Sequence, residues 1–122
     1  MVYTDDGIEE LQKIGIRNEA AEVPTHICFA GSDNTYTGAE IDLTDEYIRK
    51  EITWSKSGKA SIYTAELTSA EAVGSYIGTI GIVSGSDLGT GSLFAIDQSF
   101  ISDKTASYNV SITGEIIIER PS

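Results

Sequence analysis

The sequence has very few of the residues that build disulfides and metal centres. Its 122 residues include one cysteine, Cys28, and one histidine, His26. A single cysteine cannot form a disulfide within the chain, so folding does not require an oxidising compartment. A single histidine excludes a multi-histidine metal centre within one chain, and a serine–histidine–aspartate triad would have to use His26. We therefore expect no metal and no cofactor, and a strand histidine with local hydrogen bonds.

Long apolar runs and basic residues are also scarce. No segment approaches the roughly 18 consecutive apolar residues of a membrane span, and the acidic start of the chain is unlike a secretory signal. We expect a soluble chain with no membrane partner. Eight basic residues stand against 19 acidic ones, which gives a net charge of −11. Such a surface repels phosphate and argues against nucleic-acid binding.

Apolar residues in alternating patterns are, by contrast, abundant. Hydrophobic residues make up 40% of the chain, enough for one core without disulfides or metal. The patterns add up to about six to eight antiparallel strands between about residues 24 and 119, with one helix at about residues 5–14. The predicted fold is mainly β, an antiparallel β-sandwich or flattened barrel with one N-terminal helix, in a single domain over residues 1–122.

The N-terminal helix has clear start and stop signals. Thr4 or Asp5 can cap it, and Gly15 can end it. Three residues at spacing three form one apolar stripe: Ile8, Leu11 and Ile14. So short a helix is marginal without packing, so we expect the stripe to dock on the sheet or on a neighbouring subunit.

A β-hairpin is predicted around Ser57-Gly58, which separates two runs of alternating apolar and polar residues. Pairing of Lys56 with Lys59 would place Arg49 directly opposite Glu66, as an ion pair. The opposite face of the hairpin would then be core, with six residues: Ile48, Ile52, Trp54, Tyr63, Ala65 and Leu67.

Other segments follow the same reasoning. Residues 24–31 and 92–98 read as strands, and residues 108–119 read as a long strand in the middle of a sheet.

Five residues of the loop at 32–45 carry oxygen ligands of the kind that calcium takes: Asp33, Asn34, Glu40, Asp42 and Asp45. Their spacing is not that of an EF-hand, and we expect them to bond their own backbone. The glycine-rich loop at 85–91 lacks a lysine and precedes a strand, so it reads as a flexible connector and not as a phosphate cradle.

The region from Tyr47 to Val83 also resembles a known pattern. Arg49 to Thr53 is followed by the Ser57-Gly58 turn, by a Ser-x-Glu-x-x-Gly loop at 69–74, and by a strand from Ile77 to Ile82. This order is similar to that of tail-fibre and related tail or neck proteins of tailed bacterial and archaeal viruses. Thr79 stands where that pattern usually has an acidic residue, so any ion pair that this residue makes in relatives is absent here. The resemblance implies a virion structural subunit, assembled in the host cytoplasm, with other virion proteins as partners.

Two classes of function remain open. The first is the virion subunit, expected to be a homo-oligomer, and the second is a carbohydrate- or surface-binding β module that contacts a cell-surface glycan. Exposed tyrosines would stack on sugars in the second case: Tyr3, Tyr36 and Tyr76. No activated nucleophile or selected pair of carboxylates is visible, so we do not expect an enzyme. Because the net charge of −11 opposes self-association, the interface should be apolar and uncharged or have segregated charge, with the hairpin face away from Trp54 and the 85–91 loop as candidates.

Overall fold

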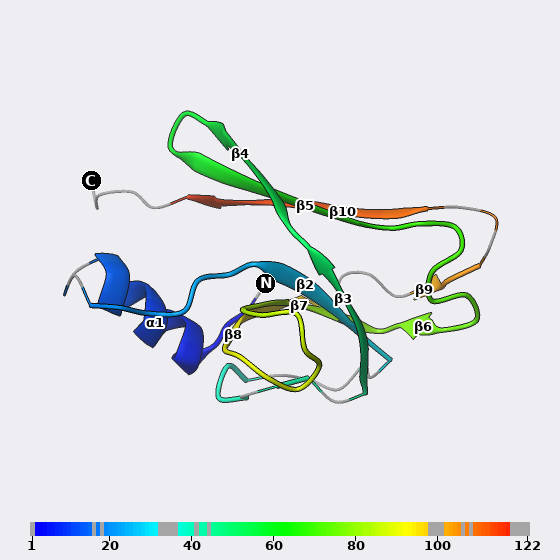
Figure 1. Ribbon diagram of the computed structural model, residues 1–122, viewed down its shortest axis with the longest axis horizontal. Helices are drawn as coiled ribbons and strands as arrows, with labels where there is room; N and C mark the ends of the chain where they lie inside the picture. Colours follow the sequence, from blue (N-terminus) through cyan, green and yellow to red (C-terminus); the bar gives the residue numbers. More distant parts are fainter. Residues whose placement is uncertain are drawn as a thin grey trace.

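The protein consists of two antiparallel sheets that face each other, with one helix at an end (Figure 1). The computed structural model describes residues 2–15, 17, 19–31, 37–40, 42–43, 45–97, 102–105, 107 and 109–117. Within these residues the helix is α1 (Asp5–Gly15) and the strands number ten, three of which have only two residues. The prediction of a mainly β, sandwich-like fold with one N-terminal helix is confirmed.

The larger sheet has five strands in the order β1-β8-β7-β2-β3, all antiparallel. Its members are β1 (Val2–Tyr3), β8 (Leu93–Asp97), β7 (Thr79–Val83), β2 (His26–Ala30) and β3 (Glu46–Glu51). Strand β7 is buried at every position, and β2 at all but its first, because this sheet is covered on both faces. The continuous apolar runs of these two segments fit that position.

The smaller sheet has three strands in the order β10-β5-β4. They are β10 (Val110–Ile117), β5 (Ala60–Leu67) and β4 (Thr53–Ser57), and a separate pair, β6 (Tyr76–Ile77) with β9 (Ser102–Asp103), lies at the end away from the helix (Figure 1). The prediction that the long C-terminal strand is central is wrong. Strand β5 takes the central place because it pairs with β4 through the hairpin and with β10 on its other side.

The hairpin turn differs from the prediction by one residue. Ser57 pairs with Ala60, so Gly58 and Lys59 form the turn, and Gly58 has a φ of 58°. A glycine with positive φ at the first central position is typical of a type II′ turn, which suits the twist of a hairpin. The register therefore places Trp54 opposite Tyr63. Each residue keeps its predicted face, because a shift of two in the register preserves the alternation of side chains.

The predicted ion pair between Arg49 and Glu66 is wrong, because the chain changes sheets at Ile52. Strand β3 belongs to the larger sheet, where Arg49 lies opposite Cys28. Strand β4 belongs to the smaller sheet, and Glu66 lies opposite Ser111 of β10 and accepts a hydrogen bond from its hydroxyl. Pairing of Arg49 with Glu66 would require β3 and β4 to form one strand beside β5, and the switch of sheets separates them.

The main core fills the space between the two sheets. It contains residues from both layers: Ile27, Phe29, Ile52, Tyr63, Ala65, Leu67, Ile77, Ile80, Ile82, Phe94, Ala95 and Ile112. A second cluster covers the opposite face of the larger sheet: Cys28, Ala30, Leu43, Val83, Leu93 and Ile96. Burial, together with the nearby Glu46 carboxylate, raises the pKa of the Cys28 thiol to about 12. Cys28 is therefore a neutral core residue.

Helix α1 is anchored by its first turn. The Thr4 side chain is fully buried, accepts a hydrogen bond from the Gly7 backbone at 3.0 Å and donates one to the Leu93 carbonyl. The Thr4 backbone N–H donates to the Phe94 carbonyl at 2.9 Å, which extends the pairing of β1 with β8. Gly7 lies so close to β8 that a Cβ atom there would be 2.5 Å from the Phe94 backbone. Thr4, one of the two residues predicted for this role, is thus the cap, and Gly7 makes the close contact with the sheet.

Candidate interaction surface

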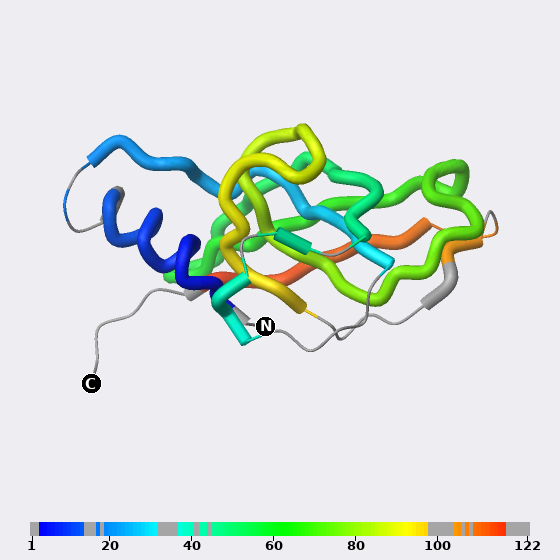
Figure 2. Tube along the Cα trace, turned by 90° about the horizontal axis from the view of Figure 1, so that it is seen from below, coloured from blue at the N-terminus to red at the C-terminus, as the bar shows by residue number. Residues whose placement is uncertain are grey.

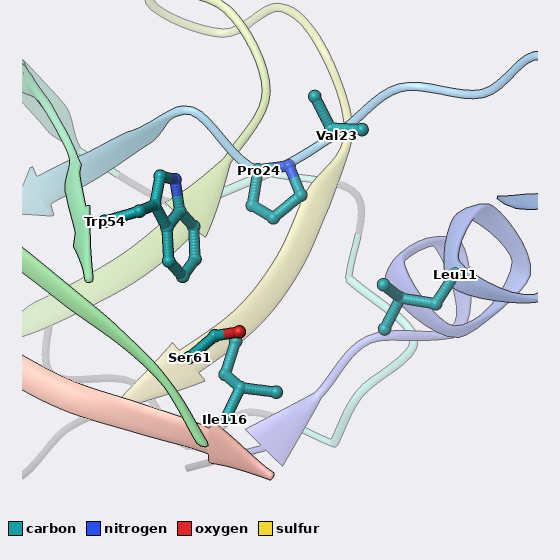
Figure 3. A pocket seen from close by; sticks show the side chains of 6 residues that line it. All are labelled: Leu11, Val23, Pro24, Trp54, Ser61 and Ile116. Atoms are coloured by element: carbon teal, nitrogen blue, oxygen red, sulfur yellow. The ribbon is translucent and has the colours of Figure 1, made fainter. Parts of the chain in front are cut away.

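An apolar groove lies between the helix and the β4–β5 hairpin. Its volume is about 350 Å³ and it is open to solvent, with six lining residues: Leu11, Val23, Pro24, Trp54, Ser61 and Ile116 (Figure 3). Leu11 comes from α1, Val23 and Pro24 from the connector before β2, and the others from the three strands of the smaller sheet. Most of the exposed lining is carbon, so the groove is an exposed apolar surface.

The hairpin forms one wall of the groove. Trp54 lies opposite Tyr63, and their rings meet edge to face at 71°, with centroids 6.1 Å apart. The next row towards the tip on the same face is Lys56, Ser61 and Ile116, which pair across β4, β5 and β10. These rows continue the core face of the smaller sheet beyond the part that the larger sheet covers.

This overhang explains why the predicted burial of Trp54 is wrong. The hairpin projects beyond the strands of the larger sheet (Figure 1), and the Trp54 side chain is 40% exposed. Trp54 does occupy the predicted core face, on which Tyr63 and Ala65 are buried. The uncovered end of that face is the groove, and periodicity alone gives no sign of where the cover ends.

The helix supplies the opposite wall, and its predicted apolar stripe is not a docked core. Ile8 is 45% exposed and Leu11 is 37% exposed, so the prediction that these two side chains dock on the sheet of their own chain is wrong. The physical reason is that the buried side of the helix at its start is formed by Thr4 and Gly7, which allow a closer approach than isoleucine would. The Ile14 backbone is helical, and its side chain lies outside what the structure describes.

Two lysines beside this groove, Lys56 and Lys59, form no ion pair with the residues that the structure describes. In the described part of the chain, four basic residues form ion pairs with glutamates: Lys13, Arg17, Arg49 and Lys50. Lys104 is buried and donates hydrogen bonds to the Ser69 and Thr105 carbonyls. Lys56 and Lys59 are exposed and form no ion pair with any described residue. These two lysines therefore place positive charge at the hairpin tip of a chain whose net charge is −11.

The glycine-rich loop between β7 and β8 is held in place by a buried ion pair. Arg49 and Glu46 are bonded through their side chains, which are 2% and 6% exposed. The Arg49 guanidinium also donates to three loop carbonyls, those of Ser84 at 3.2 Å, Gly85 at 3.0 Å and Thr90 at 2.9 Å. The loop was expected to be a flexible connector, and the structure instead gives it a specific set of hydrogen bonds. Arg49 stands next to Lys50 in the sequence, and no local pattern indicates its contact with a loop that lies more than 30 residues further along the chain.

His26 and the Glu22 carboxylate, two groups of the kind used in catalysis, each form side-chain hydrogen bonds with neighbouring hydroxyls. The His26 ring bonds to the Thr25 hydroxyl at 2.8 Å, as expected for a strand histidine with local bonds. The Glu22 carboxylate accepts hydrogen bonds from the Ser84 and Ser92 hydroxyls. Within the described residues there is no group of three or more His, Cys, Asp or Glu side chains that could hold a metal ion.

The acidic loop follows the expectation where it is described. Glu40 accepts hydrogen bonds from the Thr37 and Gly38 backbones, both at 2.7 Å, and these bonds lower the pKa of its carboxyl. Asp42 and Asp45 are exposed, whereas Asp33 and Asn34 lie outside the described residues. Glu40 thus bonds its own loop, in the manner of a turn residue.

The tyrosines considered for sugar stacking are not one site. Tyr3 is 43% exposed on β1, whereas Tyr76 is half-buried on β6 and its carbonyl accepts the Tyr47 hydroxyl at 3.3 Å. These two residues belong to different sheets, and Tyr36 lies outside the described residues. Trp54, which the sequence predicts as core, is an exposed aromatic residue that lines the groove.

Comparisons with family models, with curated proteins and with solved structures found no match. No helix among the described residues is long and apolar enough to cross a membrane.

Proposed function

We propose that the chain is a non-enzymatic structural subunit of a tailed virus, in the tail, neck or fibre-attachment region, and that it acts by assembling with other virion proteins and with itself. The observation that carries the proposal is the apolar groove, at which Leu11, Val23 and Trp54 remain 37%, 49% and 40% exposed. Clustered exposure of this kind is typical of a surface that another protein covers.

The edge of the smaller sheet supports the same proposal. Among the strands that the structure describes, β4 pairs only with β5, and every one of its residues is exposed. Since Ser57 and Ala60 close the turn, the backbone groups of Trp54 and Lys56 point away from β5. An edge strand with free backbone groups can take up a further strand or segment of another chain.

The placement in a virion rests on the resemblance of residues 47–83 to tail and neck proteins. In the structure this stretch runs from β3 through the β4–β5 hairpin to β7, and so it includes the groove wall formed by Trp54 and Ser61. The part of the sequence that carries the resemblance therefore contributes to the proposed assembly surface.

Two experiments test the proposal. Mass spectrometry of purified virus particles from the source organism should find this chain as a regular component, in fixed ratio to other virion proteins. Its absence from intact particles would contradict the virion role. Light scattering of the purified chain should find an oligomer, or a complex once other virion proteins are added. A monomer that binds none of them would contradict assembly as its function.

A second candidate function is supported by the exposed Trp54 ring. An aromatic face beside an open groove can stack on a sugar, as a surface-binding module would require. A glycan array separates the two candidates. Binding of a defined glycan that is lost in Trp54→Ala, by a chain that stays monomeric, would favour the binding module.

A further inference from the structure

The β7–β8 loop presents an exposed leucine in a fixed shape. Leu88 is 50% exposed at the loop and is preceded by the exposed Asp87 (Figure 2 shows the loop projecting from the body, in yellow). The Asp87 carbonyl accepts hydrogen bonds from the Thr90 backbone at 3.3 Å and the Thr90 hydroxyl at 2.7 Å. The Gly89 backbone donates to the Glu46 carboxylate at 3.4 Å. A loop that is ordered before binding loses little entropy when a partner covers it.

The groove and Leu88 match in size and polarity. A closed cavity of about 150 Å³ can hold benzene, which has more carbon atoms than a leucine side chain. The groove, at about 350 Å³, has room for one leucine between Leu11 and Trp54. Leu88 is not among the residues that line the groove of its own chain, so a second copy would have to supply it.

The charges beside the two surfaces are opposite. Asp87, next to Leu88, is exposed and forms no ion pair with any described residue. Lys56 lies directly across from Ser61, which lines the groove, and Lys59 lies in the adjoining turn. Contact between loop and groove would therefore bring a carboxylate towards two ammonium groups, none of which forms an ion pair with a described residue. Such complementarity overcomes, at one place, the repulsion between copies of charge −11.

We propose that copies of this chain associate through these two surfaces, with Leu88 of one copy in the groove of the next and Asp87 beside that copy's Lys56 and Lys59. This inference rests on the proposed assembly function and names its partner and contact residues. The contact joins two unlike surfaces of the chain. Each copy therefore offers one loop and one groove, and repetition of the contact closes a ring when the rotation between copies allows it.

The test uses two variants that each remove one side of the contact. Leu88→Asp removes the loop anchor, and Leu11→Glu puts a charge in the groove; both residues are exposed, so the fold should tolerate the changes. Sedimentation velocity at physiological salt should show the unchanged chain as an oligomer. In each variant the affinity between copies should fall by about thirty-fold or more, which is the effect of losing a central anchor. The control is Val73→Asp. Val73 is 52% exposed, much like Leu88, but lies outside both surfaces, so this variant should remain an oligomer.

Mixing the two variants gives the decisive result. Leu88→Asp keeps an intact groove and Leu11→Glu keeps an intact loop, so an equimolar mixture should associate although neither variant does alone. Failure of the mixture to associate would overturn the inference. An oligomer that survives both substitutions would also overturn it, while leaving the proposed assembly function in place. An unchanged chain that is monomeric at millimolar concentration would overturn it as well, and binding to other virion proteins would then decide the proposed function separately.

A reversal of charge tests the electrostatic part. Asp87→Lys should weaken association, and adding Lys56→Asp and Lys59→Asp to the same chain should restore it, because the signs are complementary again. Restoration supports the assigned contact. If the triple variant associates as weakly as Asp87→Lys alone, these charges do not meet in the contact. That result would overturn the placement of Asp87.

Discussion

Arg49 and Glu46 form a buried ion pair, and the same arginine fixes the β7–β8 loop through three carbonyl groups. The five donor groups of a guanidinium allow one side chain to bond both a carboxylate and several carbonyls, which an ammonium group cannot do with the same geometry. The pair thus links strand β3 to the loop that carries Leu88. The sequence analysis does not predict this ion pair, because the alternating pattern places Arg49 opposite Glu66.

Substitution of Arg49 should be strongly destabilising. Arg49→Ala leaves the Glu46 carboxylate buried without its partner, which costs about 3–5 kcal/mol in the free energy of unfolding. Lys50→Ala is the matched control on the next residue, because the Lys50–Glu71 pair is 28% and 27% exposed and should be worth only about 0–1 kcal/mol. Urea unfolding of both variants measures the difference. Equal, small losses would show that the Arg49 pair does not stabilise the fold.

A methyl group at Gly7 should loosen the helix. Helix propensity alone predicts that Gly7→Ala gains about 1 kcal/mol. Because the new Cβ atom would be 2.5 Å from the Phe94 backbone, we expect instead a loss of about 1–3 kcal/mol. Thermal unfolding checks the sign, with Gln12→Ala on the exposed side of α1 as a control that should change stability by less than about 0.5 kcal/mol. A stabilised Gly7→Ala protein would mean that the helix does not pack on β8 as described.

Stability should fall in acid partly through Glu71. The Lys50 ammonium and the Thr68 backbone N–H both donate to the Glu71 carboxylate and lower its pKa below the ordinary value of 4.5. A carboxyl whose pKa is lower in the folded state stabilises the fold above pH 4.5, and that contribution is lost as the pH falls through the folded-state pKa. Between pH 7 and pH 3 the melting temperature of Glu71→Gln should therefore fall less than that of the unchanged chain.

The control for this pH dependence is Glu115→Gln, at an exposed glutamate that forms no ion pair with a described residue. It should reproduce the pH profile of the unchanged chain. Identical profiles for all three proteins would exclude a contribution from the Lys50–Glu71 pair.

The sequence predicts the fold class well because its signals are local. The cap at Thr4, the alternation in β5 and the apolar runs of β2 and β7 each depend on neighbouring residues. The switch of sheets at Ile52 has no such signal, since the chain stays extended there and the Ile52 N–H simply bonds the Thr25 carbonyl at 2.9 Å. Because the switch depends on a long-range contact, the local pattern does not reveal it, and the prediction pairs Arg49 with Glu66 incorrectly.

The candidate surface was predicted only in part. The 85–91 loop was selected for its low net charge, and the structure adds that Arg49 holds it in place. The groove was missed because Trp54 has the pattern of a core residue. The exposure of Trp54 depends on how far the hairpin extends past the larger sheet, and the sequence pattern does not indicate that distance.

Hydrogen–deuterium exchange measured at low and high protein concentration tests most directly whether the chain assembles through the groove and the loop. At the higher concentration, peptides from three segments should exchange more slowly: residues 8–13 of α1, residues 53–61 of the hairpin and residues 84–92 of the loop. Peptides from the opposite end, such as residues 68–77, should exchange at the same rate at both concentrations. Protection of the opposite end instead, or exchange that is independent of concentration along the whole chain, would contradict assembly through this surface.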